Sequence, residues 1–409
     1  MAFDNYEHLA ELVRDEPLPA ILVDLDVLDA NVRRLGAVAA EHGKNLRVAS
    51  KSVRVPDILH RIQRVGGEHF RGLMCFSVAE SQLLAEHGFD DLLVAYPTVQ
   101  RSDLEIAAEL TGAGTVLTLM VDSPLQVSLL ADFWRARGHG QGNTGRPLRV
   151  CIDQDMSWRP GKLHIGAQRS PIRTTDDFAQ LLDAIVAREE LQLSGVMGYE
   201  AQIAGVGDEN PFAPLLNPAK KLIKLQSVKD VARKRREVSE LLRRRGIAID
   251  FFNGGGTGSI RTTAREDWVS EVTAGSGFLQ SHLFDYYASN QNQPAICFAL
   301  QVTRIPQDDR VTCQSGGYIA SGSADADKAP IPFLPAGLKP DKLEGFGEVQ
   351  TPLLVPTALR GKLGPGDPVF FRPAKAGEIA EHFNDYLLIE DGEFCGRAKT
   401  YRGLGHCFH

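Results

Sequence analysis

The sequence lacks any run of about eighteen apolar residues, so we expect no membrane-spanning helix. Positive charge is also limited: 45 Lys and Arg stand against 52 Asp and Glu, which gives a formal net charge of −7. A surface that binds nucleic-acid phosphates needs a basic excess, so nucleic acid is not expected as the main partner. The first eight residues are acidic and polar, unlike the basic and then apolar layout of a signal peptide.

Cysteine is sparse and scattered. None of the six cysteines stands in a C-x-x-C spacing with another, which argues against a zinc ribbon or a dithiol motif. Cys75 and Cys151 lie inside apolar segments and are expected to be buried thiols. We therefore expect a soluble protein of the reducing cytoplasm.

Apolar, β-branched segments alternate with segments that have apolar residues at helical spacing, such as Val55–Val65 and Ala79–His87. Eight such strands in roughly 250 residues predict a (β/α)8 barrel, an α/β fold, although a doubly wound open sheet would also alternate. The predicted strands are Leu46–Lys51, Gly72–Ser77, Asp91–Tyr96, Val116–Asp122, Leu148–Asp155, Leu193–Glu200, Ile249–Gly255 and Glu271–Ser276.

The pattern changes after Tyr287, where short strand-like segments are separated by turn-rich runs. This texture predicts a smaller, mostly-β C-terminal domain. We place the barrel at residues 20–288 and the β domain at residues 289–409, with residues 1–19 packing on the β domain. Within the barrel, Lys220–Arg245 is rich in Lys and Arg; it is typical of a solvated outer helix, with a basic binding surface as the alternative. The predicted strands of the second domain are Ile296–Arg304, Arg310–Gln314, Pro368–Arg372 and Tyr386–Ile389.

Lys51 ends the first predicted barrel strand. The C-terminal ends of barrel strands surround the mouth in which barrel enzymes place their reactive groups. A lysine amine that is desolvated, or that lies near other positive charge, can lose its proton and attack a carbonyl. Lys51 is therefore our candidate for holding pyridoxal phosphate as a Schiff base, and the alternative is a solvated surface lysine.

Two runs of small residues, Gly254–Ser259 and Gly275–Gly277, follow the last two predicted strands. Glycine has no Cβ to block the close approach of an anion, and the hydroxyls of Thr257 and Ser259 add donors. Barrels commonly hold a phosphate on the loops that follow strands seven and eight. Each run alone is also typical of a tight turn, but the two together predict a phosphate site.

Arg159 follows the fifth predicted strand, and Tyr199 lies at the end of the sixth. An arginine that faced the pyridine nitrogen would disfavour protonation of that nitrogen, because two positive charges would meet. Arg159 is the candidate for this contact, and an ordinary surface ion pair is the alternative.

Taken in this order, the residues resemble fold-type III pyridoxal-phosphate enzymes of the D-threonine aldolase and D-serine dehydratase family. That family joins an alanine-racemase-like N-terminal barrel to a C-terminal β domain. The resemblance covers most of the chain: its landmarks are Pro19–Asp26, the lysine strand, the segment around Arg159, Gly198–Glu200, Gly254–Gly258, Glu271–Ser276, Gly366–Pro373 and Arg402–Gly403.

The resemblance implies a lyase that acts on a D-β-hydroxy amino acid by retro-aldol cleavage or by dehydration. It also implies a homodimer with the active site at the interface, and it leaves the amino-acid substrate unidentified. An amino-acid racemase is one alternative, for which Tyr318 is the candidate second acid–base group; a non-catalytic cofactor-binding protein is another. The residues implied for the cofactor are Lys51 for the Schiff base, Arg159 for the ring nitrogen, Tyr199 beside the cofactor or substrate, and Gly255, Gly256, Thr257, Gly275 and Ser276 for the phosphate.

The run Pro373–Gly377 departs from the family pattern at a divalent-metal site. Lys375 stands where the family has a histidine and Gly377 where it has a second ligand, and neither can coordinate a cation. We therefore expect no metal ligands here. Lys375 either supplies some of the metal's positive charge, as a catalytic candidate near the β-hydroxyl, or is an ordinary surface lysine. Glu378 and His382 have a spacing that can bind metal, but no third ligand is evident nearby.

Overall fold

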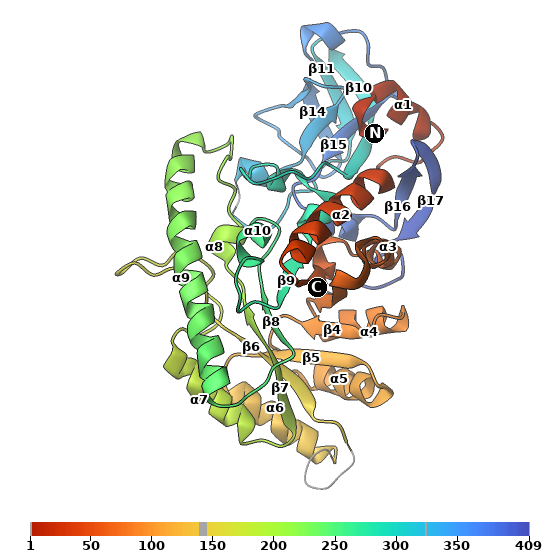
Figure 1. The fold of residues 1–409 in the computed structure, drawn as a ribbon. Helices are drawn as coiled ribbons and strands as arrows, with labels where there is room; N and C mark the ends of the chain where they lie inside the picture. Colours follow the sequence, from red (N-terminus) through yellow and green to blue (C-terminus); the bar gives the residue numbers. More distant parts are fainter. Residues whose placement is uncertain (1, 139–144, 324, 409) are drawn as a thin grey trace.

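A closed barrel of eight parallel strands and a separate nine-stranded sheet make up the protein. The computed structural model describes residues 2–138, 145–323 and 325–408. In Figure 1 the barrel and its helices occupy the lower part of the view, and the blue strands of the second sheet lie above them. The predicted fold class, a (β/α)8 barrel with a mostly-β domain, is confirmed.

The barrel strands follow one another in chain order, and the last pairs in parallel with the first. They are almost entirely buried, because side chains fill the inside and helices cover the outside. All eight predicted strands overlap them: β2 (Asn45–Ala49), β3 (Phe70–Cys75), β4 (Asp91–Val94), β5 (Val116–Val121), β6 (Leu148–Asp153), β7 (Leu191–Gly198), β8 (Phe251–Gly254) and β9 (Glu271–Ala274).

Helices surround the barrel, and several begin at a side chain that caps them. Ser77 and Ser123 each accept a hydrogen bond from the first turn of the following helix, and Thr174 forms a capping box with Asp177. The helices are α2 (Leu25–Glu41), α3 (Pro56–Gly66), α4 (Val78–Glu86), α5 (Arg101–Ala113), α6 (Pro124–Ala136), α7 (Thr175–Val186), α8 (Ala201–Ala204), α9 (Asn217–Arg244), α10 (Ile260–Thr263) and α11 (Ser276–Leu279).

The second sheet has the order β13-β14-β11-β10-β1-β16-β17, with β15 on β10 and β12 on β15. The helix α1 (Tyr6–Leu12) packs on it, and the Tyr6 hydroxyl donates to the Pro368 carbonyl at 3.1 Å. Its elements are β1 (Ala20–Asp24), β10 (Ile296–Gln307), β11 (Arg310–Gln314), β12 (Ile331–Leu334), β13 (Lys339–Pro340), β14 (Gln350–Leu354), β15 (Pro368–Arg372), α12 (Ala376–Ile379), β16 (Asp385–Glu390) and β17 (Glu393–Lys399).

The predicted domain boundary at residue 20 assigns β1 to the barrel, whereas the structure places β1 in the second sheet. It pairs antiparallel with β10 and parallel with β16, so it belongs to the second sheet and not to the barrel. A strand that is buried on both faces has the same apolar composition in a barrel and in a covered sheet. The sequence therefore could not tell these two locations apart. The helix α2, in red in Figure 1, then carries the chain from the β domain to the barrel.

Cys75 and Cys151 are buried free thiols, as predicted. Among the described residues, no helix is both long enough and apolar enough to cross a membrane.

Candidate active site

A cavity of about 500 Å³ opens at the C-terminal ends of the barrel strands. This volume is in the range that holds a small cofactor with a substrate. Each barrel strand or the segment after it contributes to the wall, including Lys51, Met74, Tyr96, Asp122, Asp153, Arg169, Tyr199, Asn253, Gly255, Gly256, Thr257, Thr273, Gly275 and Ser276.

Lys51 extends its side chain into this cavity from a single 3₁₀ turn, η2 (Ser50–Ser52). Its Nζ donates a hydrogen bond to the Tyr96 hydroxyl at 2.8 Å. Two hydrogen bonds fix the backbone of this turn. Ser50 Oγ donates to the Met74 carbonyl at 2.9 Å, and Arg54 Nε donates to the Lys51 carbonyl at 3.2 Å. The backbone of the lysine is thus held in place at the base of its side chain.

The β domain contacts the backbone of the lysine through α12. A Cβ added at Gly377 would lie 1.8 Å from the Lys51 carbonyl oxygen, far inside the contact distance of any two heavy atoms. With the backbone as it stands, only glycine fits at this position. Gly377, which the sequence marks as a lost metal ligand, is therefore a packing contact between the two parts of the fold.

The two small-residue turns face the cavity, but their amides are not equally available. Gly255 N–H donates to Glu200 Oε2 at 3.1 Å, and Gly256 N–H donates to Ser259 Oγ at 3.1 Å. Gly255 also has a φ of +87°, which favours glycine. These two residues shape the turn, while the Thr257 and Ser276 hydroxyls and the backbone at Gly275 also line the cavity.

A buried ion pair anchors the first of these turns. Glu200 accepts hydrogen bonds from Arg235, from Gly255 N–H, from Ser259 Oγ at 2.7 Å and from Thr263 Oγ1. Burial disfavours the charge of Glu200, but Arg235 and the hydroxyl and amide donors together hold the pKa of Glu200 below its usual value.

Arg235 reaches this pair from α9 and is fully buried. It also donates to the Gly198 carbonyl and to Glu266 Oε1, both at 2.6 Å. The sequence predicted this helix as a solvated outer face or a basic surface, and all of its charged side chains except Arg235 are at least partly exposed. No local signal singled out Arg235, because its partners come from other parts of the chain.

The structure does not place Arg159 in the cavity wall. Its guanidinium donates to Asp155 at 2.9 Å and to Ser157 Oγ at 3.1 Å, and its side chain is one-third exposed. This is the ordinary ion pair that the sequence left open as the alternative. Arg169 lines the cavity instead.

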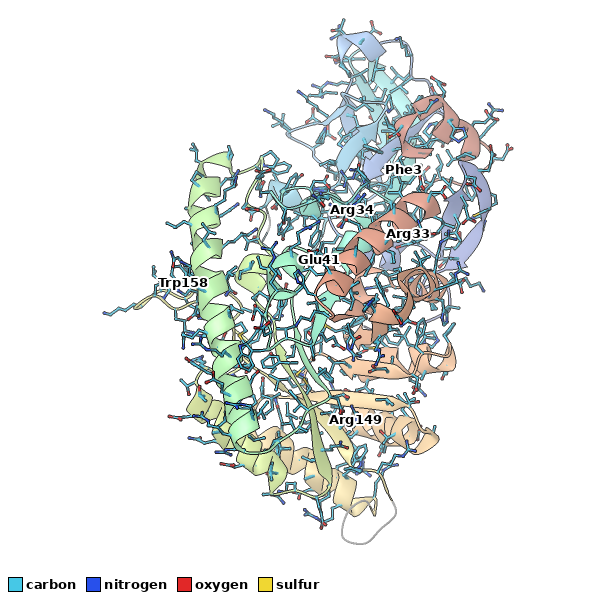
Figure 2. The ribbon with its side chains drawn as sticks, viewed as in Figure 1. Phe3, Arg33, Arg34, Glu41, Arg149 and Trp158 are labelled. Atoms are coloured by element: carbon cyan, nitrogen blue, oxygen red, sulfur yellow. The ribbon has the colours of Figure 1, made fainter. Side chains whose placement is uncertain are left out.

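A short hairpin after β6 explains the difference. Trp158 and Ile165 exchange backbone hydrogen bonds at 2.8 and 2.9 Å, so the chain runs outward and then returns. Figure 2 shows Trp158 at the outer side of the molecule, beside α9. On the return, Ser170 Oγ donates to the Asp153 carbonyl at 2.6 Å, which places Arg169 at the strand end.

Two carboxyl groups and a phenol complete the polar part of the wall. Asp122 and Asp153 follow the paired residues Val121 and Ile152 of neighbouring strands. Burial and the charge of Asp122 raise the pKa of Asp153 to about 7, against the opposing effect of Arg169. Burial is also the main reason that the pKa of Tyr199 is raised to about 12. The sequence placed Asp122, Asp153 and Tyr96 at strand ends but gave them no role.

Lys375 is not among the residues that line the cavity. Its Nζ donates to Glu378 Oε1 at 2.7 Å and to the Ser321 carbonyl at 2.9 Å. Tyr318 is also absent from the wall: its hydroxyl pairs with Ser315, and its ring lies 5.0 Å from that of His382. Within residues 2–138, 145–323 and 325–408, no group of three His, Cys, Asp or Glu side chains could hold a metal ion.

Residues 23–277 match the family profile described as alanine racemase, N-terminal domain. The sequence is 24% identical over 258 residues to the 3-hydroxy-D-aspartate aldolase of Paracoccus denitrificans (strain Pd 1222), which covers 63% of this chain and 59% of that protein. It is 24% identical over 306 residues to the D-threonine aldolase of Arthrobacter sp, covering 73% and 71%. The chain thus spans less than two thirds of the Paracoccus relative.

Solved structures show the same fold over nearly the whole chain. The D-threonine aldolase from Filomicrobium marinum superposes with a TM-score of 0.79 at 19% identity, covering 96% of each chain. The D-threo-3-hydroxyaspartate dehydratase from Delftia sp. HT23 superposes with a TM-score of 0.74 at 18% identity, covering 95% of this chain and 98% of the other. Both likenesses extend across the barrel and the β domain.

Proposed function

The chain belongs to the alanine racemase N-terminal domain family, and we propose that it is a pyridoxal-phosphate-dependent lyase acting on a D-β-hydroxy amino acid. One observation carries the proposal: Lys51 shares a single cavity with two small-residue turns that follow β8 and β9. Relatives named as aldolases, and a fold shared with an aldolase and a dehydratase, support a lyase of this class.

The residues present fit pyridoxal phosphate. Lys51 would bind its aldehyde carbon, and the turns at Gly255–Thr257 and Gly275–Ser276 would take its phosphate. Arg169, which lines the cavity, takes the place of Arg159 as the candidate whose guanidinium would face the pyridine nitrogen of the cofactor. When bound, the cofactor supplies an electron sink for the bond that breaks at Cα.

The remaining chemistry belongs to side chains of this chain. The Lys51 amine, once released by the substrate, would take or return the proton at Cα. The β-hydroxyl loses a proton in aldol cleavage and gains one in dehydration, so a proton-transfer group must lie near it. Tyr199 lines the cavity and stays a candidate, whereas Lys375 would first have to leave Glu378.

A metal step is not part of this proposal. At the position where the resemblance to D-threonine aldolases and D-serine dehydratases implies metal ligands, the Lys375 ammonium pairs with Glu378 and Gly377 has no side chain. Those residues do not fit a divalent cation. We expect added Mn²⁺, Zn²⁺ or EDTA to leave turnover unchanged, and a large gain with metal would contradict this expectation.

The alternatives receive less support from the geometry. A racemase needs a second acid–base group, and Tyr318 lies outside the cavity wall. A non-catalytic cofactor carrier would not need a β domain packed against the lysine backbone, as Gly377 is here.

We propose that the molecule is a cytoplasmic homodimer. Exposed apolar side chains gather on η4 (Pro214–Leu216) and the first turns of α9, and such patches mark interaction surfaces. A reducing compartment would keep the six cysteines as thiols. The exposed side chains of this patch are Phe212, Leu215, Leu216, Leu222 and Leu225. A dimer would bury them, and sedimentation equilibrium measures whether the protein is a dimer.

The decisive experiment combines labelling with product analysis. Protein supplied with pyridoxal phosphate is reduced with borohydride and mapped, and Lys51 should carry the label while Lys51→Ala should not. D-Threonine, D-serine and D-3-hydroxyaspartate are then tested separately. Glycine with an aldehyde identifies an aldolase, an α-keto acid with ammonia a dehydratase, and the L-isomer a racemase. An unlabelled Lys51, or no product from any of these substrates, would contradict the proposed function.

A further inference from the structure

We propose that Tyr96 is a catalytic residue that exchanges protons with the Lys51 amine and serves the β-hydroxyl of the substrate. This inference rests on the proposed role of Lys51. Its basis is the 2.8 Å hydrogen bond between Lys51 Nζ and the Tyr96 hydroxyl, within the cavity wall.

The contact spans two strand spacings of the barrel. Lys51 follows β2 and Tyr96 follows β4, with β3 between them, so their strands lie about 10 Å apart at roughly 4.8 Å per spacing. Only two long side chains directed at one another can bridge that gap. The residue that β3 contributes to the wall between them is Met74, which has no proton to exchange.

Tyr96 is positioned by the barrel rather than by the lysine. Val94 pairs with Cys75 in the sheet, and Ala95 N–H donates to the Cys75 carbonyl at 3.0 Å. The tyrosine is half-buried and is followed by Pro97, which restricts the backbone. The hydroxyl is therefore in place before a substrate arrives.

The other titratable groups of the wall are less suited to this exchange. Asp155 is bound to Arg159, and Asp153 lies beside Asp122 and Arg169 at the ends of β5 and β6. Burial raises the pKa of Tyr199 to about 12, which makes its hydroxyl harder to deprotonate than an ordinary phenol. Within the described part of the chain, the Tyr96 hydroxyl is the one side-chain group that hydrogen-bonds to Nζ of the lysine.

Geometry also brings the β-hydroxyl of a substrate to the same place. The substrate nitrogen takes the position that Nζ held, and the β-oxygen follows it by three single bonds, about 3–4 Å away at roughly 1.5 Å per bond. A group 2.8 Å from Nζ is therefore within reach of that oxygen.

The proton balance closes in either reaction. In dehydration, Lys51 takes the Cα proton as the C–H bond breaks, Tyr96 gives its proton to the β-oxygen as the C–O bond breaks and water leaves, and the ammonium then reprotonates the phenolate. In aldol cleavage, the phenolate takes the β-hydroxyl proton as the Cα–Cβ bond breaks and a C=O bond forms. The ammonium protonates Cα, and the phenol then returns one proton to the amine.

Tyr96→Phe tests the inference because it removes the hydroxyl and keeps the ring. We expect borohydride labelling of Lys51 to persist and the pH titration of the cofactor's visible band to shift. We also expect kcat to fall by about 10²-fold or more with little change in KM. If the reaction is a dehydration, exchange of the substrate Cα proton with D₂O should continue, because Lys51 performs that step.

Tyr318→Phe is the matched control, since it removes one hydroxyl outside the cavity. Tyr96→His distinguishes the loss of a proton-transfer group from a folding defect. Because histidine is also titratable, this variant should recover part of the turnover that Tyr96→Phe loses, with the pH profile moved to lower pH. The inference is overturned if Tyr96→Phe matches Tyr318→Phe in turnover and in the pH titration. If Lys51 is unlabelled in the unaltered protein, the proposed function fails as well; if Lys51 is labelled but Tyr96→Phe has no effect, only this inference fails.

Discussion

Arg235→Met should destabilise the protein more than any exposed arginine substitution on the same helix. The side chain is fully buried and pairs with Glu200, while Glu266 and the Gly198 carbonyl accept its other hydrogen bonds. Removing one partner of a buried ion pair leaves the other charged in a low-dielectric environment, at a cost of about 3–5 kcal/mol. That range corresponds to a change of roughly 10²–10⁴ in the folding equilibrium.

The effect should extend to the cofactor. Glu200 accepts hydrogen bonds from the N–H of Gly255 and from the hydroxyls of Ser259 and Thr263. In Arg235→Met, Glu200 loses its positive partner, and the turn that would take the phosphate should become less ordered. We expect weaker binding of pyridoxal phosphate as well as a lower urea midpoint. The stability deficit should shrink at low pH, because protonation of Glu200 removes the uncompensated buried charge.

Urea unfolding and cofactor titration, each at neutral and acidic pH, measure both effects. Arg236→Met is the matched control: that side chain is 55% exposed and lies 3.9 Å from Glu240, so it should change stability by less than about 0.5 kcal/mol. Combining Arg235→Met with Glu200→Gln should recover part of the loss, because both members of the pair are then uncharged. If Arg235→Met and Arg236→Met behaved alike, the account of the anchored turn would be refuted.

Three further predictions follow from single contacts. Gly377→Ala should displace the lysine turn and reduce borohydride labelling, whereas Gly112→Ala in α5, where nothing lies within 4 Å, should not. Burial raises the pKa of Glu80 to about 7, so the charged form of Glu80 is disfavoured in the folded state. The protein should therefore lose stability as the pH rises from about 4.5 through 7. In Glu80→Gln, the Tm should change less with pH between pH 5 and 7.5 than in the unaltered protein. Arg169→Met should change the visible spectrum of bound pyridoxal phosphate, and Arg159→Met should leave it unaltered.

The parts of the fold that could be predicted are those with a local pattern. The barrel strands are short apolar runs between helical periods, and Lys51 stands at the end of one of them. The two glycine-bearing turns are also visible in the sequence, because glycine and hydroxyl residues follow β8 and β9 directly. Each of these inferences needs only neighbouring residues.

What could not be predicted depends on residues that are distant along the chain. Arg159 is nearer to its strand in sequence than Arg169, but a hairpin carries it outward and returns the later arginine to the cavity. Arg235 is one of many basic residues on α9, and only the packed structure shows that it meets Glu200. The pairing of Tyr96 with Lys51 likewise requires the curvature that closes the barrel.

The assignment of β1 to the second sheet has a consequence for synthesis on the ribosome. Leu22 lies opposite Leu387, so this edge of β1 can be covered only after residue 387 has been made. The lysine turn likewise gains its neighbour at Gly377 only after residue 377 has emerged. A chain cut before residue 377 should therefore leave the backbone of the lysine turn without this neighbour, even though every residue that lines the cavity precedes residue 285.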